Sequence, residues 1–541
     1  MPWRETGALA RHFLQGLFRL NFLDDAGEES FRRVIIGLLA GFLAFGLWLP
    51  RLFARKYFYL GQLGQADVYL QALQADQLLM LCLPMFVVAM AMALVCQSLF
   101  PDETDYRILM ALPVSRAAIF SAKLLALLAF ASIFIITTNV AIGVPFAAIS
   151  TGPLNPHYWP VRAVAQVAAG LLGAIFAAGS VIALQGLVSI ATPRGSLRSI
   201  SVLMQTALVC ALVLVVPILA RVPTQGALLR AQPAWLSVVP PVWFLGLEET
   251  LLGSRDPYFV RLAELAISGT AAVGLMAALC YGFVYRRFDR VILRTEKGGK
   301  TSAIRRFRGR PEYAAVRAFT TATLHRSGLH QIVCLSICAA GLALTINNQD
   351  VLRAPLVLMF SAVLGLRAAL LLPVTRQAAW VFRITENETR RRHQLAAVEH
   401  FVLECGVLVP MLITFPIQVK MLGWTDALVA LPLTAALGIL LVEIALLRWH
   451  RIPFTCTYLP GKRPVAHTFL LLLLSFSFFT AGGGALLSSA AAHDSTMPVA
   501  IFVFAALAAA FRLVRTQTNH NRPLEFEDEL PESTYGLQLN S

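Results

Sequence analysis

Long apolar runs separated by short polar intervals are the dominant pattern of this 541-residue chain. A helix that crosses the hydrocarbon core of a bilayer needs about 20 mostly apolar residues, and twelve runs come near that length. The pattern therefore predicts an all-α polytopic membrane protein with about 12 transmembrane helices. The predicted spans cover residues 34–50, 78–99, 119–145, 163–192, 200–220, 262–285, 329–346, 354–373, 401–419, 427–447, 467–489 and 498–514.

A basic interval, residues 287–326, divides the predicted spans into two six-helix halves, 34–286 and 327–515. The sequence Leu-Pro-Val-Ser-Arg at 112–116 recurs as Leu-Pro-Val-Thr-Arg at 372–376, and each copy follows the second span of its half. This echo favours duplication of a six-helix half, as occurs among transporters with parallel repeats. Chance similarity over a short stretch is the alternative.

The segment before the first span, residues 1–33, has an amphipathic pattern. Leu9, Phe13, Leu17 and Leu20 share one helical face, while the arginines of the segment lie elsewhere. This pattern predicts an interfacial helix at the membrane surface, and a loose N-terminal tail is the alternative. Acidic residues ahead of the first apolar run argue against a cleavable signal peptide.

The distribution of charge predicts the orientation of the spans. Lys and Arg accumulate on cytoplasmic segments, and 34 of the 45 basic residues fall on one set of alternating segments while 10 fall on the other. We therefore expect cytoplasmic N- and C-termini and a multi-pass protein of the plasma (inner) membrane. The acidic composition of residues 516–541 predicts a disordered tail, to which the sequence assigns no role.

Composition agrees with this class, because 57% of the residues are hydrophobic, 14% are charged and the mean hydropathy is +0.68. The formal net charge of +15 is explained by span orientation and by attraction to anionic headgroups. Membrane lipids are thus expected partners, and nucleic acid is not required to explain the charge.

A short charged interval, residues 100–118, lies between the second and third predicted spans. Its acids come first, where they oppose a helix dipole, and Ile108, Leu109 and Leu112 recur on one side. An amphipathic helix held at the membrane surface between two spans is suited to contact another protein. The predicted contact residues of this docking helix are Asp102, Glu103, Asp105, Tyr106, Arg107, Leu109, Leu112, Pro113 and Arg116.

Simpler roles remain open for the same residues. Helix capping and solvation would explain the acids, and Arg116 and Lys123 would serve as anchors at the inner membrane interface. The counterpart of the docking helix in the second half would include Pro373 and Arg376, although no acidic stretch precedes them.

The order of an amphipathic N-terminal helix, two spans, the segment DETDYRILMALPVSRAAIFSAKL and four more spans resembles the membrane subunit of type-2 ATP-binding-cassette (ABC) exporters. The resemblance covers about residues 1–290. It implies that the interval 100–118 carries a coupling helix for a separate nucleotide-binding subunit, which binds the ATP. It also implies that the apolar outer loop, residues 222–260, re-enters the membrane. The second half departs from this pattern, because its stretch WVFRITENETRRRH is more basic.

On this resemblance the chain is a permease subunit with no cofactor and no enzymatic activity of its own. It would work as a homodimer or as a single-chain pseudo-dimer, and the second half would serve transport, assembly or regulation. The transported molecule is left open among lipids, peptides and drugs.

Three other classes of protein are alternatives to a permease subunit. Zinc, nucleophile-elbow and intramembrane aspartate motifs are missing, which disfavours a membrane enzyme. An ion-coupled secondary transporter would place ionisable groups within spans, and it predicts that Arg367→Ala or Glu443→Gln abolishes transport without a partner. A non-transporting scaffold or regulatory subunit is the remaining alternative. Four polar residues within spans, which are Asn139, Gln166, Gln185 and Gln205, are expected to form interhelical hydrogen bonds.

Overall fold

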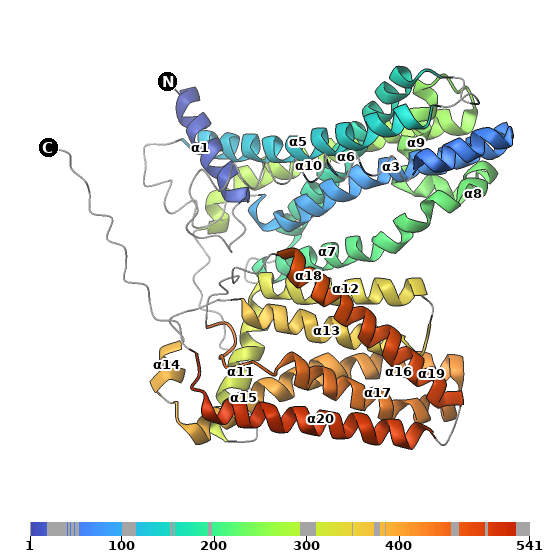
Figure 1. Cartoon of the computed structure of the whole chain (residues 1–541). Coiled ribbons are helices and arrows are strands. Elements are labelled where there is room, and N and C mark those ends of the chain that lie inside the picture. Colours follow the sequence, from blue (N-terminus) through green and yellow to red (C-terminus); the bar gives the residue numbers. More distant parts are fainter. Residues whose placement is uncertain are drawn as a thin grey trace. The chain divides into compact units, whose positions relative to one another are not determined.

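The computed structural model shows an all-α polytopic membrane protein (Figure 1). Its described residues form helices and turns, with no strand among them, and eleven of these helices are long and apolar enough to cross a membrane. The chain divides into two compact units, Met1–Gly299 and Lys300–Ser541. The structure describes residues 2–18, 41, 44, 48, 53–99, 115–151, 154, 157–192, 197–292, 310–348, 350–372, 379–384, 386–455, 465–492 and 496–525.

The first unit begins with helix α1 (Pro2–Phe18) and, after residues that lie mostly outside the described part, continues with a helical segment at 53–63. The first predicted span, 34–50, falls among those residues, so only eleven of the twelve predicted spans can be compared. The candidate spans of this unit are α3 (Ala66–Leu94), α5 (Arg116–Ile149), α6 (Trp159–Ala191), α7 (Leu197–Arg221) and α10 (Pro257–Ile292). A short 3-10 helix, η1 (Cys96–Ser98), follows α3.

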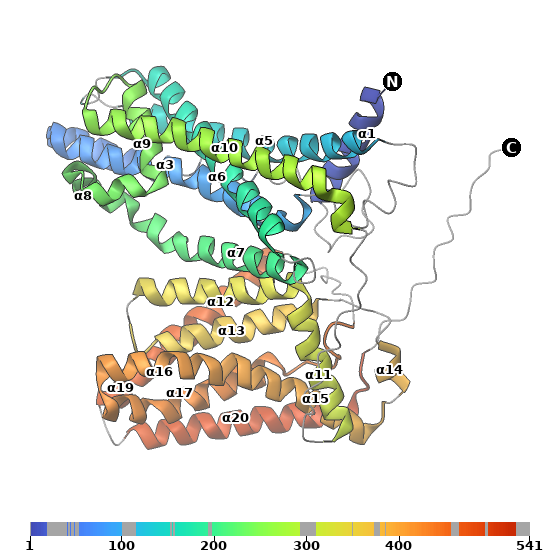
Figure 2. The ribbon, with the colours of Figure 1, turned by 180° about the vertical axis from the view of Figure 1, so that it is seen from behind.

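Helix α6 is the packing centre of the first unit, where α3, α5 and α10 contact it (Figure 2). Its buried face carries small residues such as Ala169, Gly173 and Ala174, which let neighbouring helices approach closely. On the facing side of α3, Val88 and Met92 are fully buried against this small-residue face. The small residues thus explain why a helix with little side-chain volume occupies the centre.

The connection between α7 and α10, predicted as the apolar outer loop 222–260, is folded into short helices. These are η2 (Val222–Thr224), α8 (Gly226–Ala231), η3 (Ala234–Val238) and α9 (Pro240–Leu251). Helix α9 contacts α3, α6 and α10. At Gly246 a Cβ atom would lie 2.3 Å from the Cβ of Leu262, so glycine permits the close approach of α9 to α10. Burial in protein therefore explains the apolar character of α9, whereas Trp235 and Val238 of η3 remain exposed.

The described part of the second unit begins with α11 (Pro311–Arg326), and α14 (Ala379–Ile384) is the shortest α-helix described in it. One-turn π-helices, η5 (Glu404–Leu408) and η6 (Phe478–Gly482), interrupt two of its spans without ending them. Its other helices are α12 (Gly328–Asn348), α13 (Ala354–Leu371), α15 (Glu388–Leu403), α16 (Val409–Leu422), α17 (Trp424–Ala445), α18 (Val465–Ser477), α19 (Gly483–Ala492) and α20 (Thr496–Asn521).

Two predicted domain boundaries need correction. The basic linker, 287–326, is too long, because α10 continues to Ile292 and α11 begins at Pro311. Val316 of α11 is fully buried in the core of the second unit, so this charged helix belongs to that unit. The acidic tail, predicted from residue 516, also begins later. Helix α20 continues to Asn521, and Leu524 is only 5% exposed in the same core.

Candidate functional site

The predicted docking helix lies outside the described residues, which resume at Ser115 after Leu99. The structure does describe where its two ends are attached. Leu99 is 1% exposed, and Ser115 caps α5 by accepting a hydrogen bond from the Ala118 amide at 3.2 Å. Arg116 is the first residue of α5. The interval 100–114 is therefore preceded directly by a buried residue and followed by the exposed N-cap of α5, with buried Ile119 one turn further on.

The first buried residues that the structure describes on either side of the interval belong to one apolar cluster that also includes α1. Leu99 and Ile119 are members of this cluster together with Phe13 and Leu17 of α1. Lys123 of α5, considered above as an interfacial anchor, is 8% exposed and places its ammonium 4.5 Å from the centroid of the Phe13 ring. The apolar face of α1 thus contacts α5, and we name this group of residues the anchor cluster.

The proposed second-half counterpart, Pro373 and Arg376, also lies outside the described residues. The helices that follow the two copies of the echo differ. In the first unit α5 runs without a break from Arg116 to Ile149, whereas in the second unit the short α14 ends at Ile384 before α15 begins. The echo therefore does not lead into the same local structure in both units.

A buried polar site that the sequence did not predict joins α3, α6 and α9. Glu248 of α9 is 0% exposed and accepts a hydrogen bond from Gln77 Nε2 of α3 at 2.8 Å. Gln166 of α6, in the amide orientation that lets its nitrogen donate, reaches the same carboxylate at 3.0 Å and 3.1 Å. Burial raises the pKa of Glu248 to about 8, against the opposing effects of the Gln77 hydrogen bond and of Arg162.

Further buried contacts surround this site. Asp76 of α3 is 0% exposed and pairs with Lys56 Nζ at 2.7 Å, and the Tyr57 hydroxyl donates to the same carboxylate at 2.7 Å. The carbonyl oxygen of Ser150, at the end of α5, accepts hydrogen bonds from the Tyr69 hydroxyl and from Arg162 Nη1, each at 2.8 Å. These contacts tie α3, α5, α6 and the segment 53–63 together.

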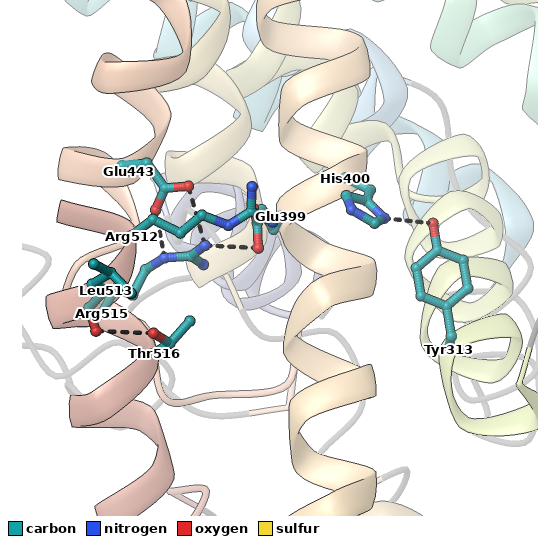
Figure 3. Close-up of polar contacts among 8 residues, drawn as sticks. All are labelled: Tyr313, Glu399, His400, Glu443, Arg512, Leu513, Arg515 and Thr516. Carbon is teal, nitrogen blue, oxygen red and sulfur yellow. Dashed lines mark hydrogen bonds and ion pairs between the residues drawn. The ribbon is translucent and has the colours of Figure 1, made fainter. Parts of the chain in front are cut away.

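The second unit holds a buried ion cluster among α15, α17 and α20 (Figure 3). Arg515 of α20 bonds Glu443 of α17 at 2.7 Å and 3.3 Å, and it pairs with Glu399 of α15 at 2.7 Å. Arg512, which is more exposed, reaches the other oxygen of Glu399 at 3.2 Å. Two carboxylates therefore face two guanidinium groups, and the cluster is balanced in charge.

The two ionisable residues named for ion coupling have structural partners. Glu443 pairs with Arg515, and not with Arg448, which lies five positions after it in the sequence. Arg367 of α13 donates a hydrogen bond to the carbonyl oxygen of Ala445 at the end of α17. Asp76 is a further ionisable residue within a candidate span, because it is fully buried in α3.

Three of the four polar span residues form the predicted interhelical hydrogen bonds. Besides Gln166, these are Gln185, which donates to Ser201 Oγ at 2.8 Å, and Gln205, which donates to the carbonyl oxygen of Leu94 at 2.8 Å. Asn139 differs, because its amide donates to the Ile135 carbonyl of its own helix at 2.7 Å. These residues thus fix helix contacts.

A signal for the missed residues was present in the sequence. Glu248 and Glu249 interrupt a stretch that is too apolar for a solvated loop, and Asp76 and Gln77 come directly before a predicted span. No cluster of three or more His, Cys, Asp or Glu residues suited to a metal ion occurs in the described part of the chain. Comparison with protein-family models, curated proteins and solved structures gives no match.

Proposed function

We propose that the chain is the permease subunit of an ABC transporter of the type-2 exporter class, driven by a separate nucleotide-binding subunit. The observation that carries the proposal is the anchor cluster. Two members of one apolar core flank the interval 100–114, with Leu99 directly before it and Ile119 five residues after it. A partner that pushes on this interval would displace α3, α5 and α1 together.

This arrangement suits mechanical coupling because the attachments are short. Only Leu99 lies between η1 and the start of the interval, and Ser115 immediately precedes α5. A packed core resists continuous deformation, so a displacement at one edge is transmitted as a rigid shift of whole helices. The predicted docking helix would be displaced by the partner, and the anchor cluster would transmit this displacement to the spans.

The folded connection between α7 and α10 adds support. In the resembled family the corresponding outer loop re-enters the membrane, and here α9 is packed on α3, α6 and α10. A shift of α3 would therefore also displace α9, which is expected on the outer side of the membrane. The chain is expected to lie in the plasma (inner) membrane, and either two copies or the two units of one chain would form the pathway.

Affinity purification in mild detergent tests the proposal. A nucleotide-binding subunit is expected to accompany the wild-type protein and to be lost when residues 102–113 are replaced by a flexible Gly/Ser segment of equal length. The matched control replaces 372–376 in the second unit and asks whether that unit also contributes to binding. Thermal unfolding of each variant shows whether the spans stay folded. A folded variant that keeps its ATPase partner after replacement of 102–113 would contradict the docking assignment.

The buried charges favour a second candidate, an ion-coupled secondary transporter. Glu443 and Arg515 are almost fully buried, and ionisable residues within spans often mark ion or proton pathways. Transport by the purified chain alone, without any ATPase and lost in Glu443→Gln, would establish this alternative. The same result would reject the permease proposal.

A further inference from the structure

Glu248 differs from the other buried carboxylates of the chain. Asp76 is paired with Lys56, and Glu443 is paired with Arg515, each at 2.7 Å. Glu248 is 0% exposed, yet no cationic side chain lies within 4.0 Å of it among the residues that the structure describes. A buried carboxylate without a cationic partner carries a large desolvation cost unless it is neutral.

The hydrogen-bond partners of Glu248 are neutral amides. Gln77 and Gln166 donate to it, and neither brings a compensating charge. Gln77 Oε1 is itself buried and has no hydrogen-bond donor. The buried groups around Glu248 therefore include one hydrogen-bond acceptor that has no donor. A protonated Glu248 carboxyl would supply that donor hydrogen.

The charged groups on the neighbouring helices do not balance Glu248. From α6, Arg162 approaches without forming an ion pair, and its Nη1 is committed to the Ser150 carbonyl. On α9 itself, the negative charge of Glu249 disfavours the ionised form of Glu248 and raises its pKa further. Arg162 affects the pKa of Glu248 more than Glu249 does, so these two charges do not favour the uncharged form, and it is burial that raises the pKa.

The remaining helices around α9 bring no free charge toward it. On α3, the carboxylate of Asp76 is already bonded by Lys56 and Tyr57. Helix α10 packs on α9 through apolar residues such as Leu262, whereas its Arg261 and Glu264 are exposed. The η3 segment contains no titratable side chain.

We propose that Glu248 is a proton-binding site, and that the bound proton holds α9 against α3 and α6. The proton comes from solvent and adds to one carboxylate oxygen. The resulting O–H donates to Gln77 Oε1 after a half-turn of the Gln77 amide, while the other oxygen still accepts from Gln166. No bond other than the O–H bond forms or breaks.

The direction of the effect follows from burial. Protonation removes the uncompensated charge, so its stabilisation of the α9 contacts is complete below the pKa of an exposed glutamate, about 4.3, and declines as pH rises from there. As pH rises through about 8, the proton leaves and an anion remains between three helices. Helix α9 is then held less tightly. This behaviour concerns α9 alone and stands whether or not an ATPase partner binds the chain.

Infrared titration of the full-length protein in detergent tests proton binding directly. Between about pH 6 and about pH 10, wild type should lose the C=O band of one protonated carboxyl with a midpoint near neutral to mildly alkaline pH. Glu248→Gln should lack this transition, and Glu249→Gln, the matched neighbour, should retain it. A transition of equal size in Glu248→Gln, or its absence from wild type, would overturn the proposal.

Hydrogen exchange of wild type supplies a measurement that needs no variant. The rates are first corrected for the intrinsic pH dependence of exchange. Protection of the α9 amides should then fall by about tenfold for each unit by which the pKa of Glu248 in packed α9 exceeds its pKa in the open form. Protection of α6 amides distant from Gln166 serves as the internal control. Protection of α9 that does not change with pH would show that the proton does not hold this helix, even if Glu248 titrates.

Discussion

At the scale of single residues, the chain neutralises buried charge in two ways. In the cluster of Glu399, Glu443 and Arg515, each carboxylate forms an ion pair with the Arg515 guanidinium. Glu248 has only amide donors and a pKa raised by burial. The first arrangement stabilises the fold, because removing either partner leaves a buried charge unpaired. The second leaves one group able to exchange a proton.

This difference predicts a severe effect of Arg515→Ala. Two buried carboxylates would lose their shared partner, and breaking a buried pair costs about 3–5 kcal/mol. Thermal unfolding in detergent should therefore show a large loss of stability. Arg512→Ala is the matched control, because the Arg512 side chain is 55% exposed and its pair with Glu399 should contribute about 0–1 kcal/mol. Equal losses in both variants would contradict the assignment of Arg515 as the central partner.

The sequence could identify some of these residues but not their partners. The sequence predicts interhelical hydrogen bonds for Gln185 and Gln205, because a polar group within a span needs such a partner. Glu443 was noticed, but its partner Arg515 lies 72 positions away, and only the packing of α17 against α20 brings them together. Pairing across such distances is set by tertiary structure, which hydropathy does not report.

At the scale of elements, hydropathy located the spans better than their ends. Helix α3 begins at Ala66, twelve positions before the predicted start at residue 78. Its first turns carry Asp67, Asp76 and Gln77, which lower the mean hydropathy without ending the helix. The missed turns are the ones that bear the buried polar site. Boundaries drawn from apolar runs therefore exclude the polar residues that burial makes important.

Charge misled the sequence interpretation of one other element, α11. The predicted linker contains α11, whose Arg317 pairs with Glu404 and whose Glu312 pairs with Arg390. These ion pairs, together with buried Val316, hold a polar helix in the second unit. A high density of charge indicates solvation only when the charges have no partners, and the sequence does not show whether they do.

Helix α1 provides a prediction at this scale. Phe13 is 5% exposed and packs in the anchor cluster, so Phe13→Ala should remove about 3–5 kcal/mol of packing and release α1 from α5. Limited proteolysis should then cleave within α1 faster than in wild type. Gln15→Ala, a change at a half-buried position on the same helix, is the control and should leave the rate unchanged. No difference between the two variants would show that α1 is held by other contacts.

At the scale of the whole molecule, the chain divides into two compact units whose local structures differ. The echo at 112–116 and 372–376 precedes one long helix in the first unit and the separate helices α14 and α15 in the second. The buried charges of the second unit include an arginine, Arg515, that pairs with two glutamates, Glu399 and Glu443. In the first unit, the buried carboxylate of Asp76 pairs with a lysine, Lys56. If the halves arose by duplication, they have since taken different structural roles, which suits docking by the first unit alone.

The predicted orientation can be tested with one residue in each unit. Ala227 of α8 is exposed and is expected on the outer side, whereas Ile384 of α14 is 75% exposed and is expected on the cytoplasmic side. In a background without the native cysteines, Ala227→Cys should react with a membrane-impermeant maleimide in intact cells. Ile384→Cys should react only after the membrane is permeabilised. The reverse pattern would place residues 100–118 outside the cell, where no ATP-hydrolysing partner could reach them, and the permease proposal would fall with the orientation.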